Sequence, residues 1–181
     1  MVQSELRGRR VSRCLAVVGG LALAGCSADS AQFGIGGVAS YSAANAVLTT
    51  GYNEDLIDPT HYRVRVNGTE QTPKERVERI ALTRAAEIGV ENKLAYFKIT
   101  ETRHGAACSA RKPGYKSADA GPVRYPTVVL DVEYGQVAAD ASWQEAATTH
   151  SRLRAELDGE SVGPEAKAAA AAEIRERCGG R

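Results

Sequence analysis

Four cysteines and three histidines are the side chains of this chain with the most versatile chemistry. His104 precedes Cys108 by four residues, a spacing that could pair a thiol nucleophile with its base or supply half of a metal site. A zinc site needs about four ligands with paired spacing, whereas His61 and His150 stand alone in separate segments. A Cys–His nucleophile would also need an orienting residue and a reduced thiol. We therefore expect no catalytic residue, no metal site and no cofactor.

Cys26 ends the motif Leu23-Ala24-Gly25-Cys26, which resembles the bacterial lipobox. In a lipobox, a branched apolar residue and two small residues form the recognition sequence for a signal peptidase, and the cysteine thiol takes up diacylglycerol. The motif stands in the right place, because it follows a basic region and an apolar run. We expect cleavage before Cys26 and lipidation of its thiol. The alternative is an ordinary secretory signal that is cut nearby.

Residues 1–25 have the layout of a signal peptide. Residues 1–13 contain four arginines and one acid, and residues 14–25 form an uncharged apolar run. A helix over that run would rise about 18 Å, short of the roughly 30 Å hydrocarbon core of a bilayer. The segment is therefore interpreted as a signal that is removed. Ser27, rather than an acid, follows the cysteine, which favours an outer-membrane lipoprotein facing the periplasm.

The composition is that of one globular domain: 181 residues, 43% hydrophobic and 25% charged. Two Phe and one Trp leave the apolar content to Ala and Val, which predicts a thin core. Removal of residues 1–25 leaves 19 basic and 21 acidic side chains, a net charge of −2. This balance does not suggest a nucleic-acid partner.

Cys108 and Cys178 remain once Cys14 has left with the signal and Cys26 carries lipid. In an oxidising compartment we expect them to form a disulfide, which would stabilise the fold by roughly 2–4 kcal/mol. Two free thiols or an intermolecular bridge are the alternatives.

Hydropathy patterns predict an α+β fold: a small β-α-β-β sheet with one helix packed on a face, plus a C-terminal helical tail. Residues 62–66, 94–101 and 127–134 alternate like strands. A helix is expected from a capping box at Thr72 to a stop at Gly89, a second over residues 142–157, and a third from Pro164. The expected organisation is a signal peptide (1–25), a flexible tether (26–50), the α+β domain (51–135) and a C-terminal helical extension (136–181).

Residues 102–126 are predicted to form a loop, and basic side chains there and on the first strand could together form a basic face. These are Arg63, Arg65, Arg103, Arg111, Lys112, Lys116 and Arg124. A solvated surface is the favoured interpretation. Tyr96 and Trp143 are interpreted as parts of the core rather than a ligand-stacking platform.

The stretch from about residue 50 to 100 resembles a family of small uncharacterised proteobacterial lipoproteins. The resemblance rests on Gly51-Tyr52-Asn53-Glu54, Tyr62-Arg63-Val64, Asn67-Gly68, Thr72, Glu75, Val77 and Leu82-Thr83-Arg84-Ala85-Ala86-Glu87. It departs from the family at Asn53, at the inverted Asn-Gly pair and at Ile88-Gly89. The resemblance implies an envelope address and a fold, with no catalytic assignment. Arg84 and Glu87 are interpreted as a structural ion pair rather than as a binding face.

Together these features predict a membrane-anchored envelope lipoprotein, not an enzyme, that serves as an accessory or protein-binding component. The alternative is a ligand-binding or enzymatic lipoprotein that acts on envelope glycan or lipid. A pocket with convergent polar groups would favour that alternative.

Overall fold

The computed structural model describes residues 37–45, 49–109 and 123–179, and it confirms the predicted α+β class. Five antiparallel strands form one sheet with the order β1-β2-β4-β3-β5, accompanied by three helices. The elements are β1 (Gly51–Asp58), β2 (His61–Asn67), α1 (Lys74–Glu91), β3 (Tyr96–Ser109), β4 (Val123–Gly135), β5 (Gln144–Glu145), α2 (Ala146–Gly159) and α3 (Pro164–Arg177).

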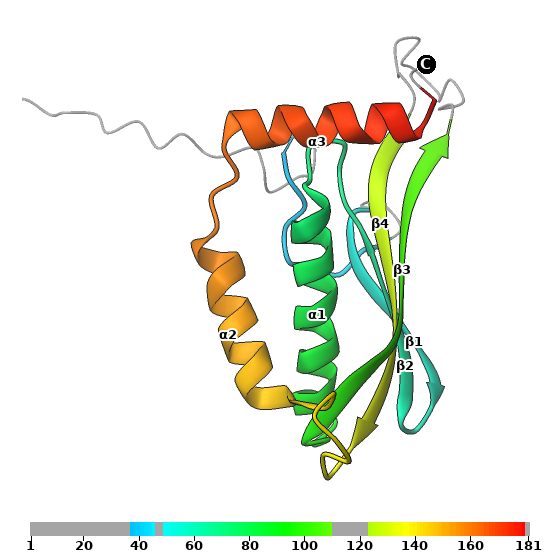
Figure 1. Cartoon of the computed structure of the whole chain (residues 1–181), viewed down its shortest axis with the longest axis vertical. Coiled ribbons are helices and arrows are strands. Elements are labelled where there is room, and N and C mark those ends of the chain that lie inside the picture. The colour runs from blue at the N-terminus through cyan, green and yellow to red at the C-terminus, as the bar shows by residue number, and fades with distance from the viewer. Residues whose placement is uncertain (1–36, 46–48, 110–122, 180–181) are drawn as a thin grey trace, which may run out of the picture.

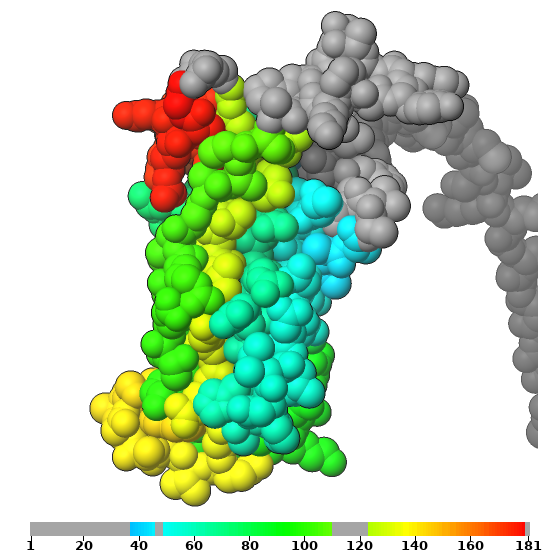
Figure 2. Space-filling model, turned by 90° about the vertical axis from the view of Figure 1, so that its right-hand side faces the viewer, coloured from blue at the N-terminus to red at the C-terminus, as the bar shows by residue number. Residues whose placement is uncertain are grey.

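The centre of the fold is a split β-α-β unit. Both β2 and β3 pair antiparallel with β4, which lies between them, so β2 and β3 run parallel to each other and α1 connects them. Helix α1 covers one face of the sheet, α2 packs along the outer side of α1, and α3 crosses one end (Figure 1). The opposite face carries no helix among the described residues (Figure 2).

The core lies between the sheet and α1. Alternate residues of the central strands point toward the helix and are buried, among them Val64 and Val66 on β2 and Leu130 on β4. The helix supplies a matching stripe that includes Val77 and Ile80. Full burial of each such side chain stabilises the fold by about 1.5–3 kcal/mol, so this layer holds α1 in place.

The sheet is larger than predicted. Strand β1 was not expected, because GYNEDLID is rich in acids and lacks apolar alternation. The predicted loop 102–126 is wrong at both ends, since β3 continues to Ser109 and β4 begins at Val123. These polar segments are strands because β3 and β4 pair through their backbones, and the register of this pairing shifts by one residue between Ile99 and Glu101.

The predicted ends of two helices are also wrong. Pro73, not Thr72, precedes α1, and the Thr72 hydroxyl instead accepts hydrogen bonds from the amides of Ala39 and Thr69. Helix α1 continues through Gly89 to Glu91. Residues 142–145 do not open α2, because two of them pair with β3 as strand β5. Tertiary contacts override these local signals.

Two segments expected outside the domain pack against it. Ala39, within the predicted tether, is 2% exposed and belongs to the core, and Ala43 bridges to Tyr52 on β1. Helix α2, within the predicted extension, buries Leu153 and Leu157. No helix within the described ranges is long and apolar enough to cross a membrane.

Candidate functional site

The two cysteines of the described residues are joined. The Cys108 and Cys178 sulfurs are 2.00 Å apart and their Cα atoms 5.5 Å apart, which confirms the predicted disulfide. Cys108 lies near the end of β3, and Cys178 follows the last residue of α3. Few other side chains hold α3, since Ala171 and Ile174 are its buried ones. The bond therefore fixes α3 across the end of the sheet.

The predicted lipidation motif, Leu23, Ala24, Gly25 and Cys26, lies outside the described residues. So do Arg111, Lys112 and Lys116 of the basic set.

The three histidines lie apart from one another. His61 is at the β1–β2 turn, where its Nδ1 is 2.9 Å from an Asp58 carboxylate oxygen. His104 on β3 borders a hollow of about 430 Å³ between α1 and α3, and His150 lies on α2. In the part of the chain that the structure describes, no three His, Cys, Asp or Glu side chains are grouped to hold a metal ion.

Three of the described basic residues of the sheet, Arg63, Arg65 and Arg103, pair with acids on neighbouring strands. Arg63 makes two hydrogen bonds to Asp131, at 2.6 and 3.0 Å, and Arg103 donates to the same carboxylate at 3.1 Å. Arg65 pairs with Asp55 at 2.8 Å. Hydrogen bonds from Arg63 lower the pKa of Asp131. The described part of this face is a ladder of cross-strand ion pairs.

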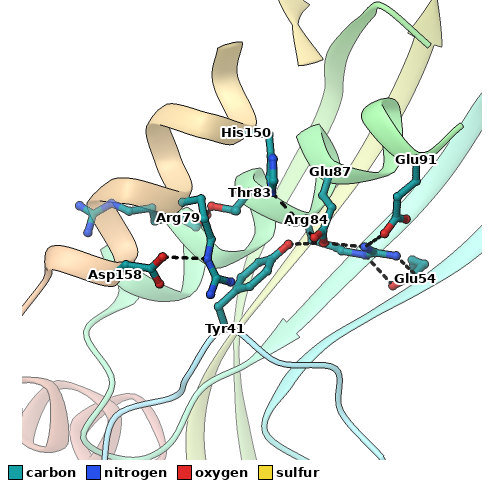
Figure 3. Close-up of polar contacts among 10 residues, drawn as sticks. Tyr41, Glu54, Arg79, Thr83, Arg84, Glu87, Glu91, His150 and Asp158 are labelled. Carbon is teal, nitrogen blue, oxygen red and sulfur yellow. Dashed lines mark hydrogen bonds and ion pairs between the residues drawn. The ribbon is translucent and has the colours of Figure 1, made fainter. Parts of the chain in front are cut away.

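The densest polar cluster surrounds Arg84 on the opposite side of the sheet (Figure 3). Its guanidinium donates to Glu54 on β1 at 2.8 Å, to Glu87 at 2.6 Å and to Glu91 at 3.0 Å. The Arg84 guanidinium carbon also lies 5.0 Å from the centre of the Tyr52 ring. Arg84 is only 9% exposed, so these partners replace the water that the cation has lost.

Two further segments reach this cluster. The Tyr41 hydroxyl donates to Glu87 at 2.5 Å, and the Tyr41 ring lies beneath the Arg154 guanidinium, 4.7 Å away. His150 on α2 places its Nε2 3.8 Å from Glu87. We call these side chains the Arg84 cluster: Tyr41, Tyr52, Glu54, Arg84, Glu87, Glu91, His150 and Arg154. It joins the N-terminal segment, β1, α1 and α2.

The ionisation of the Arg84 cluster is set by competition between burial and pairing. Burial opposes the charged form of Arg84, but hydrogen bonds to Glu54, Glu91 and Glu87 raise its pKa. Burial likewise opposes the Glu87 carboxylate, yet hydrogen bonds from Tyr41 and Arg84 lower its pKa. Burial and the Glu87 hydrogen bond raise the pKa of Tyr41. Arg84 and Glu87 therefore hold each other in the charged form.

Sequence reasoning identified the Arg84–Glu87 pair but missed its partners. Arg84 and Glu87 are three residues apart on a helix, which is visible in the sequence. The other partners contact this pair across 30 or more residues of sequence; they are Tyr41, Glu54 and His150. No local pattern predicts contacts over such separations.

A second feature lies at the β1–β2 connection. Leu56 is 61% exposed and Ile57 is 57% exposed, although both are large and apolar. Ile57 and His61 border a hollow of about 300 Å³ whose lining also includes Thr100 and Asp131. We call residues 54–61 the hairpin tip. An apolar pair between two acids, Asp55-Leu56-Ile57-Asp58, is its signal in the sequence.

Trp143 and Tyr96 are partly buried, but neither belongs to the core cluster between the sheet and α1 or packs against it. The Lys98 ammonium lies 5.0 Å from the centre of the Trp143 ring. The Trp143 indole N–H is buried without a hydrogen-bond partner among the described residues.

Comparisons with known proteins add no candidate residue. In comparisons with protein-family models, curated proteins and solved structures, no match was found. The features that the geometry offers for function are the disulfide, the Arg84 cluster, the hairpin tip and the hollow beside His104.

Proposed function

We propose that this chain is a bacterial envelope lipoprotein, anchored through lipid on Cys26, whose α+β domain is an accessory component that binds another protein. The proposed location is the outer membrane, with the domain facing the periplasm. The proposal includes membership of the lipoprotein family that the core resembles.

The disulfide is the observation that carries the envelope address. Disulfides persist in oxidising compartments such as the periplasm and are rare in the cytosol, where thiols are kept reduced. Cys108 and Cys178, the two cysteines expected to remain free of lipid, are the two that pair. A signal peptide, a lipobox and a disulfide in one chain all support export.

Binding through protein contact is supported by the surface. The sheet face opposite α1 is uncovered among the described elements, and the hairpin tip exposes two large apolar side chains (Figure 2). Contiguous exposed apolar patches mark sites of protein contact, whereas singly scattered apolar side chains are normal on a surface. The charged groups of this face, by contrast, already pair with one another.

The hollow beside His104 is the feature that favours the alternative of a ligand-binding or enzymatic lipoprotein. It is lined by side chains of both signs: Lys74, Glu75, Glu78, His104, Glu173 and Arg177. Lys74 and Glu173 approach to 3.4 Å, so part of this charge is already matched. We therefore favour protein contact.

Metabolic labelling with palmitate tests the anchor. We expect label in the wild-type chain and in Cys14→Ser, and none in Cys26→Ser, because the Cys26 thiol is the proposed acceptor. Cys14→Ser is the matched control, since it removes the other cysteine expected to be absent from the disulfide. Label in Cys26→Ser, or wild-type protein without label, would contradict the proposal.

A further inference from the structure

Strand β3 forms one edge of the sheet and is unpaired along most of its outer side. Its outer neighbour among the described residues is β5, which pairs with Tyr96 and Phe97 alone. Beyond these two residues β3 continues to Ser109 as a border of the open sheet face, with α3 at its far end (Figure 2). A long strand edge of this kind is a template for pairing with another chain.

The pairing of β4 shows which main-chain groups of β3 face outward. The Tyr134 amide donates to the Thr60 carbonyl, so even-numbered residues of β4 bond to β2 and odd-numbered ones to β3. Asp131, for example, lies opposite Glu101 on β3. The even-numbered β3 residues beyond the irregularity therefore direct their N–H and C=O groups outward; they include Thr102, His104 and Ala106. These groups have no hydrogen-bond partner among the described residues.

The hollow of about 430 Å³ opens beside this edge, on the α1 side of the sheet. His104 lines it from β3, and it lies opposite the buried Val128, so both side chains share the face that α1 covers. The start of α1 and the end of α3 supply the other lining residues: Lys74, Glu75, Glu78, Glu173 and Arg177. Every second side chain of a strand added to β3 would point to the side of the hollow, because side chains alternate between the two faces of a sheet.

The charge of this hollow is only partly matched. Lys74 and Glu173 approach to 3.4 Å, but the carboxylates of Glu75 and Glu78 have no ion pair with any side chain that the structure describes. Two cations and three carboxylates line the hollow, which gives a net charge of −1 with His104 neutral. The two unpaired carboxylates lie beside a free strand edge, and they favour a basic side chain from whatever pairs with it.

We propose that the outer edge of β3, from Thr102 to Ala106, takes up an extended segment of an envelope protein as an added strand, with a Lys or Arg side chain seated in the hollow. The inference rests on the proposed function, since it names the surface through which the anchored domain binds its partner. Main-chain hydrogen bonds to β3 would supply affinity, and Glu75 and Glu78 would select the basic side chain. Gly105 and the two alanines after it are small, so another backbone can approach closely.

Photo-crosslinking in intact cells tests the edge with the full chain. A photoreactive phenylalanine derivative replaces Glu101, which is exposed on β3, or Asn53, which is exposed on β1 at the opposite edge of the sheet. We expect one protein adduct from position 101, at least about tenfold more abundant than from position 53, because contact centres dominate binding. Mass-spectrometric mapping should find a Lys or Arg of the partner within about two residues of the crosslinked site, since alternate side chains of a strand share a face.

A proline variant tests the main-chain pairing. Thr102→Pro removes an N–H that points outward, so it leaves the hydrogen bonds to β4 in place, and edge strands tolerate proline in this orientation. With the crosslinker at position 101, Thr102→Pro should lower the adduct yield at least about tenfold. Thr102→Ala, which keeps the N–H, is the matched control and should leave the yield unchanged. The disulfide, measured as absence of free thiols, verifies folding.

A charge variant tests the basic side chain of the partner. Glu75→Gln combined with Glu78→Gln should lower the adduct yield about fivefold, because the attraction of both carboxylates is lost. The variant breaks no ion pair among the described side chains, so the fold is retained. Glu165→Gln with Glu176→Gln removes the same charge from exposed positions on α3 and should leave the yield unchanged.

The outcomes separate the two proposals. An adduct with a second copy of this chain or with residues 110–122 of the same chain would overturn the docking inference, and so would an unchanged yield in Thr102→Pro or in the glutamine variant. Adducts from position 53 but none from position 101 would also overturn it, although protein contact would then stand. No protein adduct from either position would overturn both.

Discussion

At the scale of the residue, Arg84 is the side chain on which most segments depend. It is nearly buried, and its carboxylate partners come from β1 and from α1 itself. A buried cation is tolerable because its hydrogen bonds are satisfied by groups of opposite charge. Removal of one partner of such a buried ion pair lowers the free energy of unfolding by more than the intact pair contributes to it, because the remaining charge is left buried without a counter-charge.

Replacement of Arg84 by methionine should therefore destabilise the protein by roughly 3 kcal/mol. The Glu54 and Glu87 carboxylates would then face each other without a cation. Equilibrium unfolding in urea measures the effect. Arg103→Met, on the exposed sheet face, is the matched control and should cost far less; an equal loss in both variants would contradict the structural role of Arg84.

Gly89 offers a second residue-scale test. A Cβ added there would lie 2.7 Å from the Ala146 Cβ and 3.1 Å from the Leu94 carbonyl oxygen. We expect Gly89→Ala to destabilise by about 1–3 kcal/mol, because α1 and α2 would be forced apart despite the better helix propensity of alanine. Gly159→Ala, with open space around its Cβ, should not destabilise. Thermal unfolding of the two variants shows whether a loss of stability comes from the steric clash at position 89 or from the replacement of any helical glycine by alanine.

At the scale of the element, α3 is held differently from α1 and α2. Helix α1 is clamped between sheet and α2, whereas α3 buries two side chains and relies on the disulfide at its end. The bond joins residues 70 apart and so restricts a long loop of the unfolded chain. Stability of α3 is thus coupled to the redox state of the compartment.

Cys108→Ser combined with Cys178→Ser should lower the free energy of unfolding by roughly 2–4 kcal/mol. Limited trypsin digestion should cut first near Arg175 and Arg177, because α3 would detach before the core opens. Reduction of the wild-type protein should reproduce the loss and leave the double variant unchanged. A reductant effect on the double variant would show that the loss has another source.

At the scale of the whole molecule, ionic junctions connect all layers. The Arg84 cluster joins the N-terminal segment, sheet and helices on one side, and Arg63–Asp131 joins central strands on the other. Further out, Arg76 and Arg79 on α1 pair with Glu160, beyond the end of α2. The hydrophobic core and these charge pairs therefore both stabilise the fold, and the contribution of the charge pairs depends on pH.

Acid should destabilise the protein through its paired carboxylates. The folded-state pKa values of Glu87 and Asp131 lie below their ordinary values. Their contribution is therefore complete above the unfolded pKa, near 4, and is lost as pH falls through the folded-state values. Urea unfolding between about pH 6 and pH 2 should show this decline. Glu87→Gln should flatten it, and an unaltered slope in that variant would contradict the assignment.

The sequence by itself determined the features that depend on neighbours along the chain. Local composition and periodicity predict the signal and lipobox pattern, the strand around Val64, the helix after Pro73 and the start of α3 at Pro164. The structure bears out the strand and the two helices. The disulfide could also be predicted from the sequence, because Cys108 and Cys178 were the two cysteines left to pair.

Tertiary structure alone decided the features that depend on distant partners. The acid-rich β1 and the polar half of β3 are strands because neighbouring strands satisfy their backbone groups, which no side-chain pattern reveals. Tyr41 and Glu54 meet Arg84 because chain closure brings remote segments together. Exposure of Leu56 and Ile57 is likewise a property of the folded surface, since an apolar residue in a sequence is ordinarily expected to be buried.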